Sequence, residues 1–306
     1  MHDDHDERRL NPVSSRGRHI AWLVAAAVGS LGLVVAIYVV AVRTTRGRVL
    51  DGASLRGAAQ SRSSATDLVQ RLLDAVSVAS LVIAVLSLVI IALLRFRRDL
   101  AVAAVVVVLG SNLTTQVLKR VLPRPDLGLS ETTPATLNSL PSGHTTVAFS
   151  IAVALVIVSP IALRPLLAVA GTIYASATAL ATLTAGWHRP SDSLAAFFIV
   201  TAWAAGTQVY VVRGQPVDDA DSLEFDRGAT PARMARAAVY LLAFSLVLAL
   251  LVVLARLDVY GTLAQVSVYI SSGCAMAGTA TALMAAVLIA TAPATPALPS
   301  LPVLPE

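Results

Sequence analysis

The sequence predicts an all-α polytopic membrane protein, and three observations carry this prediction. Of its 306 residues, 56% are apolar and 13% are charged, whereas a soluble domain is about half apolar and about one-quarter charged. Mean hydropathy is +0.76. The apolar residues gather in long runs, and a helix needs about 20 of them to cross about 30 Å of hydrocarbon. Composition therefore excludes a water-soluble globule.

Eight apolar runs are long enough, or nearly so, to cross a membrane as helices. They lie at residues 20–42, 74–94, 101–118, 145–163, 166–185, 193–212, 237–256 and 264–291. Several are rich in Val and Ile, but strands are shorter, and a backbone in lipid must satisfy its polar groups within its own segment. We therefore expect helices throughout. The first run is too long for the core of a secretion signal, so we read it as a retained helix.

The segments between these runs predict the organisation of the chain. We expect a disordered charged tail at 1–19, a six-helix transmembrane core at 20–212, a charged cytoplasmic connector at 213–236, two additional C-terminal transmembrane helices at 237–292 and a Pro-rich tail at 293–306. Residues 43–72 are expected as a loop. The third run ends in Asn, Thr and Gln, so its last turn is expected to face protein or water.

Arginine and lysine in short loops indicate the orientation of a membrane protein. With the N-terminus in the cytoplasm, twelve basic residues lie inside and eleven outside. The basic turn at 95–98 and the N-terminal cluster favour this orientation. The chain is then a multi-pass protein of the plasma membrane, with the loops after the third and fifth runs on the extracytoplasmic face.

Ionisable residues are nearly absent from the eight runs, which disfavours an ion-coupled transporter or a proton relay. The polar chemistry gathers instead in the loops 118–144 and 185–192. Because successive helices alternate in direction, both loops emerge on the same membrane face. Lys119 is the only lysine of the chain, and His144 and His188 are the only histidines outside the N-terminal tail. All three are thus expected on that face.

This set of residues suits a phosphoryl group. The backbone N–H groups of Ser142 and Gly143, at the start of a helix, favour anion binding. Two histidines, His144 and His188, allow a nucleophile and a separate acid. Asp192 lies four residues after His188 and can accept from its ring N–H, which fixes the tautomer.

Two other kinds of site are open at this stage. A hydrolase with Ser142 as nucleophile is disfavoured because His144 is too close in sequence to serve as its base, and no Gly-x-Ser-x-Gly occurs. A metal site built from His144, His188 and Asp192 is disfavoured because this set contains no i, i+4 pair of histidines and no cysteine.

Three segments resemble the signature motifs of the type 2 phosphatidic acid phosphatase superfamily, which includes membrane lipid phosphate phosphatases and is related to vanadium haloperoxidases. They are Lys119…Arg124-Pro125, Pro141-Ser142-Gly143-His144 and His188-x-x-x-Asp192. The resemblance covers residues 75–212 and implies that the six-helix core is phosphatase-like. The helices of 237–291 are additional to that plan.

The resemblance also implies roles. His188 would attack phosphorus and form a phosphohistidine, Asp192 would orient it, and His144 would protonate the leaving group. The implied phosphate-binding residues are Lys119, Arg124, Ser142 and Gly143. The implied substrate is a membrane lipid phosphate or pyrophosphate of the phosphatidic acid, phosphatidylglycerol phosphate or polyprenyl pyrophosphate type. No metal, cofactor or nucleic acid is expected.

The sequence departs from the family pattern at two places. Lys119 and Arg124 are closer together than in the family, and Ala181 and Thr182 stand where the third motif has Ser-Arg. Arg189 or Arg120 is the expected replacement for the missing charge. An alternative is a catalytically degenerate member that binds or transports a lipid phosphate without cleaving it.

Overall fold

The computed structural model describes residues 12–74, 78–94, 96–127, 138–214 and 229–291. Within these ranges the chain forms helices and no strand. They are α1 Pro12–Ile37, the π-helical turn η1 Tyr38–Val42, α2 Thr45–Asp74, α3 Val78–Leu94, α4 Arg98–Val121, α5 Gly143–Val158, α6 Arg164–Thr184, α7 Pro190–Arg213, α8 Ala229–Leu254 and α9 Thr262–Thr291.

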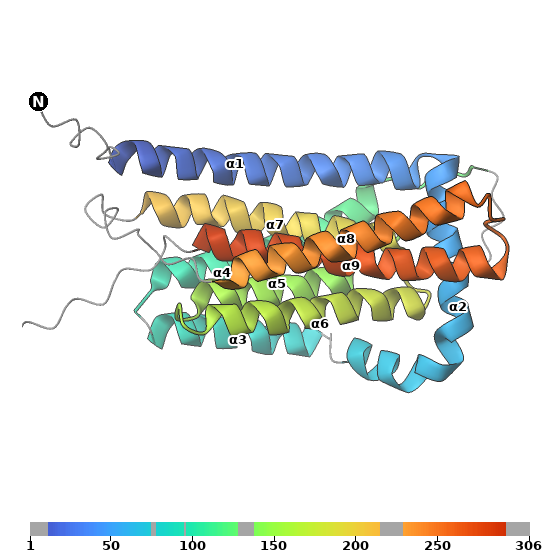
Figure 1. Ribbon diagram of the computed structural model, residues 1–306. Coiled ribbons are helices and arrows are strands. Elements are labelled where there is room, and N and C mark those ends of the chain that lie inside the picture. Colours follow the sequence, from blue (N-terminus) through green and yellow to red (C-terminus); the bar gives the residue numbers. More distant parts are fainter. Residues whose placement is uncertain (1–11, 75–77, 95, 128–137, 215–228, 292–306) are drawn as a thin grey trace, which may run out of the picture.

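The helices have the length and composition of membrane spans. Among the described residues, six are long and apolar enough to cross a membrane: α1 with η1, α4, α6, α7, α8 and α9. Two shorter apolar helices, α3 and α5, complete the bundle (Figure 1). The protein is therefore an all-α integral membrane protein, as the sequence predicts.

Helix α5 is short for a membrane span. Its 16 residues extend over about 24 Å, less than the ~30 Å of a hydrocarbon core. Helix α5 is therefore shorter than the long apolar helices that surround it.

All eight predicted helices are present, and the structure moves the start of two of them into segments predicted to lie outside the helices. Helix α1 begins at Pro12, so residues 12–19 are helical rather than part of a disordered tail. Helix α8 begins at Ala229, within the predicted connector. The rest of the predicted tails and connector, residues 1–11, 215–228 and 292–306, lies outside the described residues.

The prediction of a loop at 43–72 is wrong, because these residues form most of α2. Figure 1 shows α2 crossing the end of the bundle at which α1 ends and α7 begins. Its contact with α9 is close: a Cβ at Gly57 would stand 2.1 Å from the carbonyl oxygen of Gln265. Glycine at this position allows the two backbones to meet.

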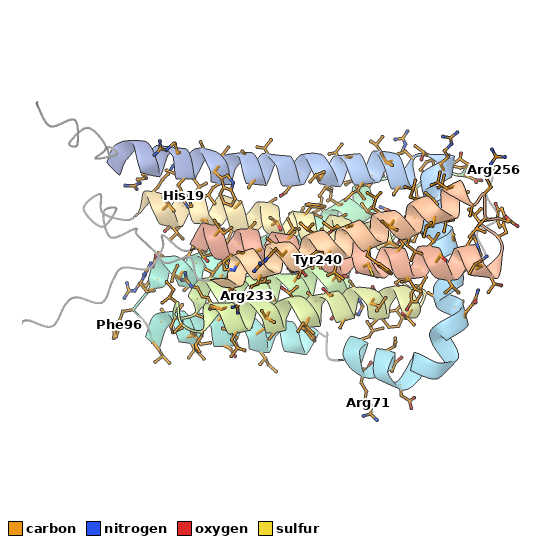
Figure 2. The ribbon with its side chains drawn as sticks, viewed as in Figure 1. His19, Arg71, Phe96, Arg233, Tyr240 and Arg256 are labelled. Atoms are coloured by element: carbon orange, nitrogen blue, oxygen red, sulfur yellow. The ribbon has the colours of Figure 1, made fainter. Side chains whose placement is uncertain are left out.

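The core lies between α4, α5, α6, α7 and α9 and is built largely from small residues. Alanines let membrane helices approach closely, and two larger side chains, Phe149 and Phe197, meet edge-on with ring centroids 5.0 Å apart. Large apolar side chains point outward instead: Leu246 is 68% exposed and Tyr240 72% (Figure 2). This distribution is typical of a bundle surrounded by lipid.

Polar side chains join α4 to its neighbours. Asn112 Nδ2 donates to Ser150 Oγ at 3.3 Å, and the hydroxyls of Thr115 and Thr146 are 3.0 Å apart. The indole N–H of Trp203 donates to Thr114 at 3.1 Å. These groups of α4 face protein, as expected for the end of the third run.

At the other end of the bundle, Arg164 is 3% exposed. Its guanidinium donates to the carbonyl oxygens of Ser159 at 3.1 Å, Thr291 at 2.6 Å and Ile157 at 3.4 Å. One side chain thus satisfies carbonyls at the C-terminal ends of α5 and α9, which the helices leave without partners.

Replacing Arg164 by Ala is expected to destabilise the fold by about 2–4 kcal/mol, because buried carbonyls lose charged donors. The exposed Arg213, at the end of α7, provides the control: its replacement by Ala should change stability by less than about 0.5 kcal/mol. Thermal unfolding in detergent measures both. Equal melting temperatures for the two variants would contradict a capping role for Arg164.

Candidate active site

The N-terminal ends of α5 and α7 meet at the end of the bundle that α2 crosses. Ser142 is the N-cap of α5, and its Oγ accepts hydrogen bonds from Thr145, at 3.4 Å from the backbone N and 3.0 Å from Oγ1. Its backbone N–H donates to the carbonyl oxygen of Asp192 at 2.9 Å. The two loops singled out in the sequence are therefore in direct contact.

Asp192 organises the second loop. It lies in the first turn of α7, is fully buried, and its Oδ2 accepts from the backbone N–H of Arg189 at 2.9 Å. The same oxygen lies 3.2 Å from Nδ1 of His188. With Nδ1 as the donor, the carboxylate fixes the ring tautomer and leaves Nε2 with a free electron pair.

The backbone before His188 is held by the end of α6. The N–H groups of Trp187 and His188 both donate to the carbonyl oxygen of Thr182, at 3.0 and 3.2 Å. Gly186 takes a positive φ of 79° in this turn, a conformation that glycine adopts at little cost. The hydroxyl of Thr182 bonds to its own helix, to the Ala179 carbonyl. Position 182 thus supports the loop through its backbone.

Lys119 reaches the start of α5. A Cβ at Gly143 would lie 3.5 Å from Nζ of Lys119 and 3.9 Å from Nε2 of Gln116. Both side chains come from the last turns of α4, so an ammonium and an amide lie beside the first residue of α5. Helix N-termini and cations both attract anions, and Lys119 also interacts electrostatically with Asp192.

His144 lies in the first turn of α5 and is half-buried. Its ring contacts that of Trp187, with centroids 5.4 Å apart. It also interacts electrostatically with His188 and with Lys119. The structure thus brings together Lys119, Ser142, Gly143, His144, His188 and Asp192, six of the nine residues proposed from the sequence.

The loop that carries Arg124 is fixed by its backbone. Tyr38 Oη donates to the Pro123 carbonyl at 2.7 Å, and Arg48 donates to the Pro125 carbonyl at 2.9 Å. Asn138 Nδ2 donates to the Leu122 carbonyl at 2.6 Å, at the end of α4. Arg124 is half-buried in this loop, so the π-helical turn and α2 position the first motif.

The two replacement arginines have different environments. Arg189, the N-cap of α7, is 1% exposed, whereas Arg120 is exposed on α4. Among the described residues, no contact joins Arg120 to the site. Arg189 interacts electrostatically with Asp51, a buried residue of α2. Of the two, Arg189 alone lies in the site.

Asp51 is a charged neighbour that the sequence did not reveal. Its Oδ2 accepts a hydrogen bond from Ser191 Oγ. Burial, helped by the nearby charge of Asp192, raises the pKa of Asp51 to about 7 against the opposing effects of the Ser191 hydrogen bond and the Arg189 charge. Asp51 and Arg48 sit in a stretch that reads as a charged loop, and no local signal marks their buried, long-range partners.

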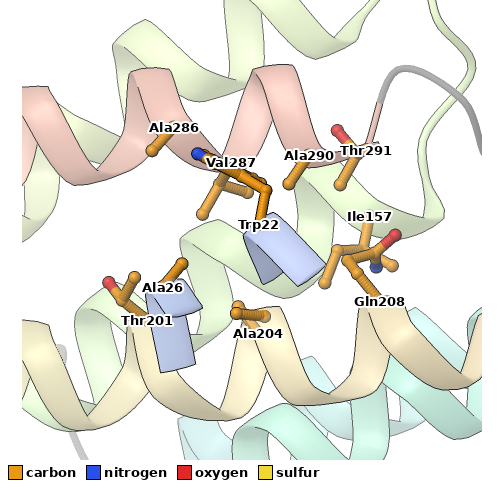
Figure 3. A pocket seen from close by; sticks show the side chains of 11 residues that line it. Trp22, Ala26, Ile157, Thr201, Ala204, Gln208, Ala286, Val287, Ala290 and Thr291 are labelled. Carbon is orange, nitrogen blue, oxygen red and sulfur yellow. The ribbon is translucent and has the colours of Figure 1, made fainter. Parts of the chain in front are cut away.

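Two further features of the described residues concern metal ligands and cavities. The described residues contain no group of three or more His, Cys, Asp or Glu side chains arranged for a metal ion. A hollow between α1, α5, α7 and α9, lined by Trp22, Thr201 and Gln208 among others (Figure 3), encloses about 20 Å³. That is room for about one water molecule, and the hollow lies toward the Arg164 end of the bundle, away from His188 and Asp192.

Taken together, the membrane bundle and the lysine, two histidines and buried carboxylate at one end of it define a membrane protein equipped for phosphoryl chemistry. Residues 100–215 match the model of the PAP2 superfamily. The match runs from α4 to the end of α7 and includes all three signature segments, so this part of the chain is similar to members of that superfamily. The family indicates, at a coarse level, a phosphatase acting on lipid phosphates. No curated protein and no solved structure matches the chain.

Gly143→Ala is expected to weaken binding of inorganic phosphate about tenfold. The added methyl would stand 3.5 Å from Lys119 Nζ, in the space between the ammonium and the helix N-terminus where an oxyanion binds. Gly206→Ala is the control, because a Cβ there meets nothing within 4 Å. Titration of purified protein with phosphate, followed by ³¹P NMR, measures the affinity. Unchanged affinity in Gly143→Ala would remove this position from the anion site.

Proposed function

We propose that the protein hydrolyses a lipid phosphate or pyrophosphate, through a phosphohistidine on His188, at the extracytoplasmic face of the plasma membrane. The observation that supports this most is the contact between the two helix N-termini. It places the His188–Asp192 pair beside the start of α5, where Lys119 lies. A nucleophile, its orienting carboxylate and an anion-binding surface thus share one site.

In the first step, Nε2 of His188 attacks phosphorus. An N–P bond forms, the bond from phosphorus to the leaving oxygen breaks, and the electron pair goes to that oxygen. His144 gives its proton to the leaving lipid alcohol or phosphate. Asp192 stabilises the positive charge that develops on the His188 ring, as the buried acid of a triad does.

In the second step, water attacks the phosphohistidine. His144, now neutral, takes a proton from this water as the O–P bond forms and the N–P bond breaks. The electron pair returns to Nε2 of His188, and inorganic phosphate leaves. One histidine therefore serves as acid and then as base, which is efficient because its ordinary pKa is near neutrality.

The transferred group carries its charge on non-bridging oxygens, and stabilising that charge is the main task of a phosphoryl-transfer site. Lys119 provides an ammonium, and the first turn of α5 provides backbone N–H groups at Gly143 and beyond. Arg124, in the loop held by Tyr38 and Arg48, provides a second cation. We assign to Arg189, the neighbour of His188 in the chain, the charge that the family's third motif carries at the position of Thr182.

The substrate is a lipid because the site opens at the end of a membrane bundle. Trp187 is 42% exposed next to His188, and tryptophan favours the membrane–water interface. The acyl or prenyl tail stays in the bilayer while the headgroup reaches the loops. The motif residues contact only the phosphate, so phosphatidic acid, phosphatidylglycerol phosphate and polyprenyl pyrophosphate types are all suitable.

A second candidate function is binding or transport of a lipid phosphate without cleavage. The observation that favours it is Thr182, whose buried side chain bonds to its own helix where an arginine would face the phosphate. Loss of one cation weakens transition-state stabilisation more than ground-state binding.

His188→Ala distinguishes the two functions. Phosphate release from a panel of lipid phosphates in mixed micelles is expected to fall at least about a thousandfold, because the covalent step is lost. His19→Ala, a histidine of α1 outside the site, should retain wild-type turnover. Equal rates for wild type and His188→Ala would support the binding function and contradict hydrolysis at this site.

The role of His144 depends on the leaving group. His144→Ala should slow hydrolysis of an alkyl phosphate about 100-fold or more, because an alkoxide needs a proton as it leaves. Hydrolysis of p-nitrophenyl phosphate should fall less than about tenfold at the same step, since nitrophenolate is stable without one. Pre-steady-state burst kinetics isolate this step. Equal losses on both substrates would show that His144 is not the general acid.

A further inference from the structure

A second buried carboxylate lies against the loop that carries His188 and Asp192. Asp51 belongs to α2, is 8% exposed, and accepts a hydrogen bond from Ser191, the residue directly before Asp192. It lies outside the segment that matches the PAP2 model. The three signature motifs therefore do not account for it.

The charges around Arg189 explain what Asp51 can do. The Arg189 side chain is 1% exposed, and a buried guanidinium needs nearby negative charge. Asp51 interacts electrostatically with both Asp192 and Arg189. Asp192 already accepts hydrogen bonds from His188 and from the Arg189 backbone. Without a charge on Asp51, the Arg189 guanidinium loses one negative neighbour, in the same turn as the Asp192 carboxylate that bonds to His188.

We propose that Asp51 is a positioning residue: its ionised carboxylate holds Ser191 and balances Arg189, which leaves Asp192 free to orient His188. This inference rests on the proposed function of the His188–Asp192 pair. Asp51 touches neither substrate nor reacting atoms. It acts through the loop between them, and it makes α2 part of the catalytic apparatus.

The charge state of Asp51 makes this role sensitive to pH near neutrality, because burial raises its pKa to about 7. The charged groups that face Asp51 are Arg189 and Asp192 at the start of α7, Arg48 one turn earlier on α2, and Arg256 after α8. Arg256 and Asp51 line the same cavity, which encloses about 390 Å³ between α2, α8 and α9. This cavity gives the carboxyl a route for proton exchange.

The test compares kcat of wild type and Asp51→Asn from pH 5.5 to pH 8.5. At the acidic end Asp51 is mostly neutral, like the Asn that replaces it, so the two proteins should turn over at nearly equal rates. At the alkaline end wild type should be about tenfold faster, with KM changed less than about twofold. Asp67→Asn, an exposed residue of α2, is the control and should match wild type throughout.

A rate ratio that stays constant across this pH range would overturn the proposal, because a purely structural defect does not depend on the charge of Asp51. Equal rates near pH 5.5 also show that the variant is folded. If Asp51→Asn does not fold, Ser191→Ala is measured instead. It removes the donor to Asp51, and a pH-independent effect there would overturn the proposal in the same way.

A measurement that needs no turnover separates this proposal from the proposed function. The ¹⁵N chemical shift of Nδ1 in His188 reports its bond to Asp192. This shift should differ between wild type and Asp51→Asn at pH 8.5 and coincide at pH 5.5. If wild type releases no phosphate but the shifts differ at pH 8.5 and coincide at pH 5.5, the proposed hydrolysis is wrong and the positioning role of Asp51 stands. Shifts that coincide at both pH values would overturn the positioning role.

Discussion

The site depends on one buried residue, Asp192, which joins the beginnings of two helices. Its carbonyl oxygen accepts from Ser142 at the start of α5, and its carboxylate accepts from Arg189 and His188 at the start of α7. A buried carboxylate is stable only when hydrogen-bond donors and nearby positive charge compensate its negative charge. The bonds that Oδ2 and the backbone carbonyl of Asp192 accept also fix His188 relative to the first turn of α5.

Around this centre the protein places charges that a membrane bundle would otherwise exclude. Lys119 and Arg189 carry positive charge, Asp192 and Asp51 negative charge, and each interacts with at least one of the others. Helix α2 makes this possible, because it crosses the end of the bundle and buries Arg48 and Asp51 against the two loops. The extra helix α9 holds α2 in place, with Gly57 packed on Gln265. The C-terminal helices thus support the site from outside the PAP2 segment.

The sequence predicts the eight apolar helices and the meeting of two loops at one end of the bundle, because helix length and alternation dictate both. Lys119, Ser142, Gly143, His144, His188 and Asp192 could be proposed since their types and order carry the chemistry. Helix α2 was missed because its charged residues look solvated when only neighbours in sequence are considered. Asp51 bonds to Ser191, which is 140 positions away in the chain. Arg189 interacts with the same distant residue, Asp51. No periodicity encodes such pairs.

The central claim is that His188 is the nucleophile, and the most direct measurement is detection of the phosphoryl group on it. Protein mixed with ³²P-labelled lipid phosphate and quenched in alkali within milliseconds preserves an N–P bond, whereas acid releases it. If His188 is the nucleophile, alkali-stable label should appear on the peptide that contains His188, form and disappear at rates consistent with turnover, and be absent in His188→Ala. Turnover without label on this peptide, or label that remains in His188→Ala, would contradict it.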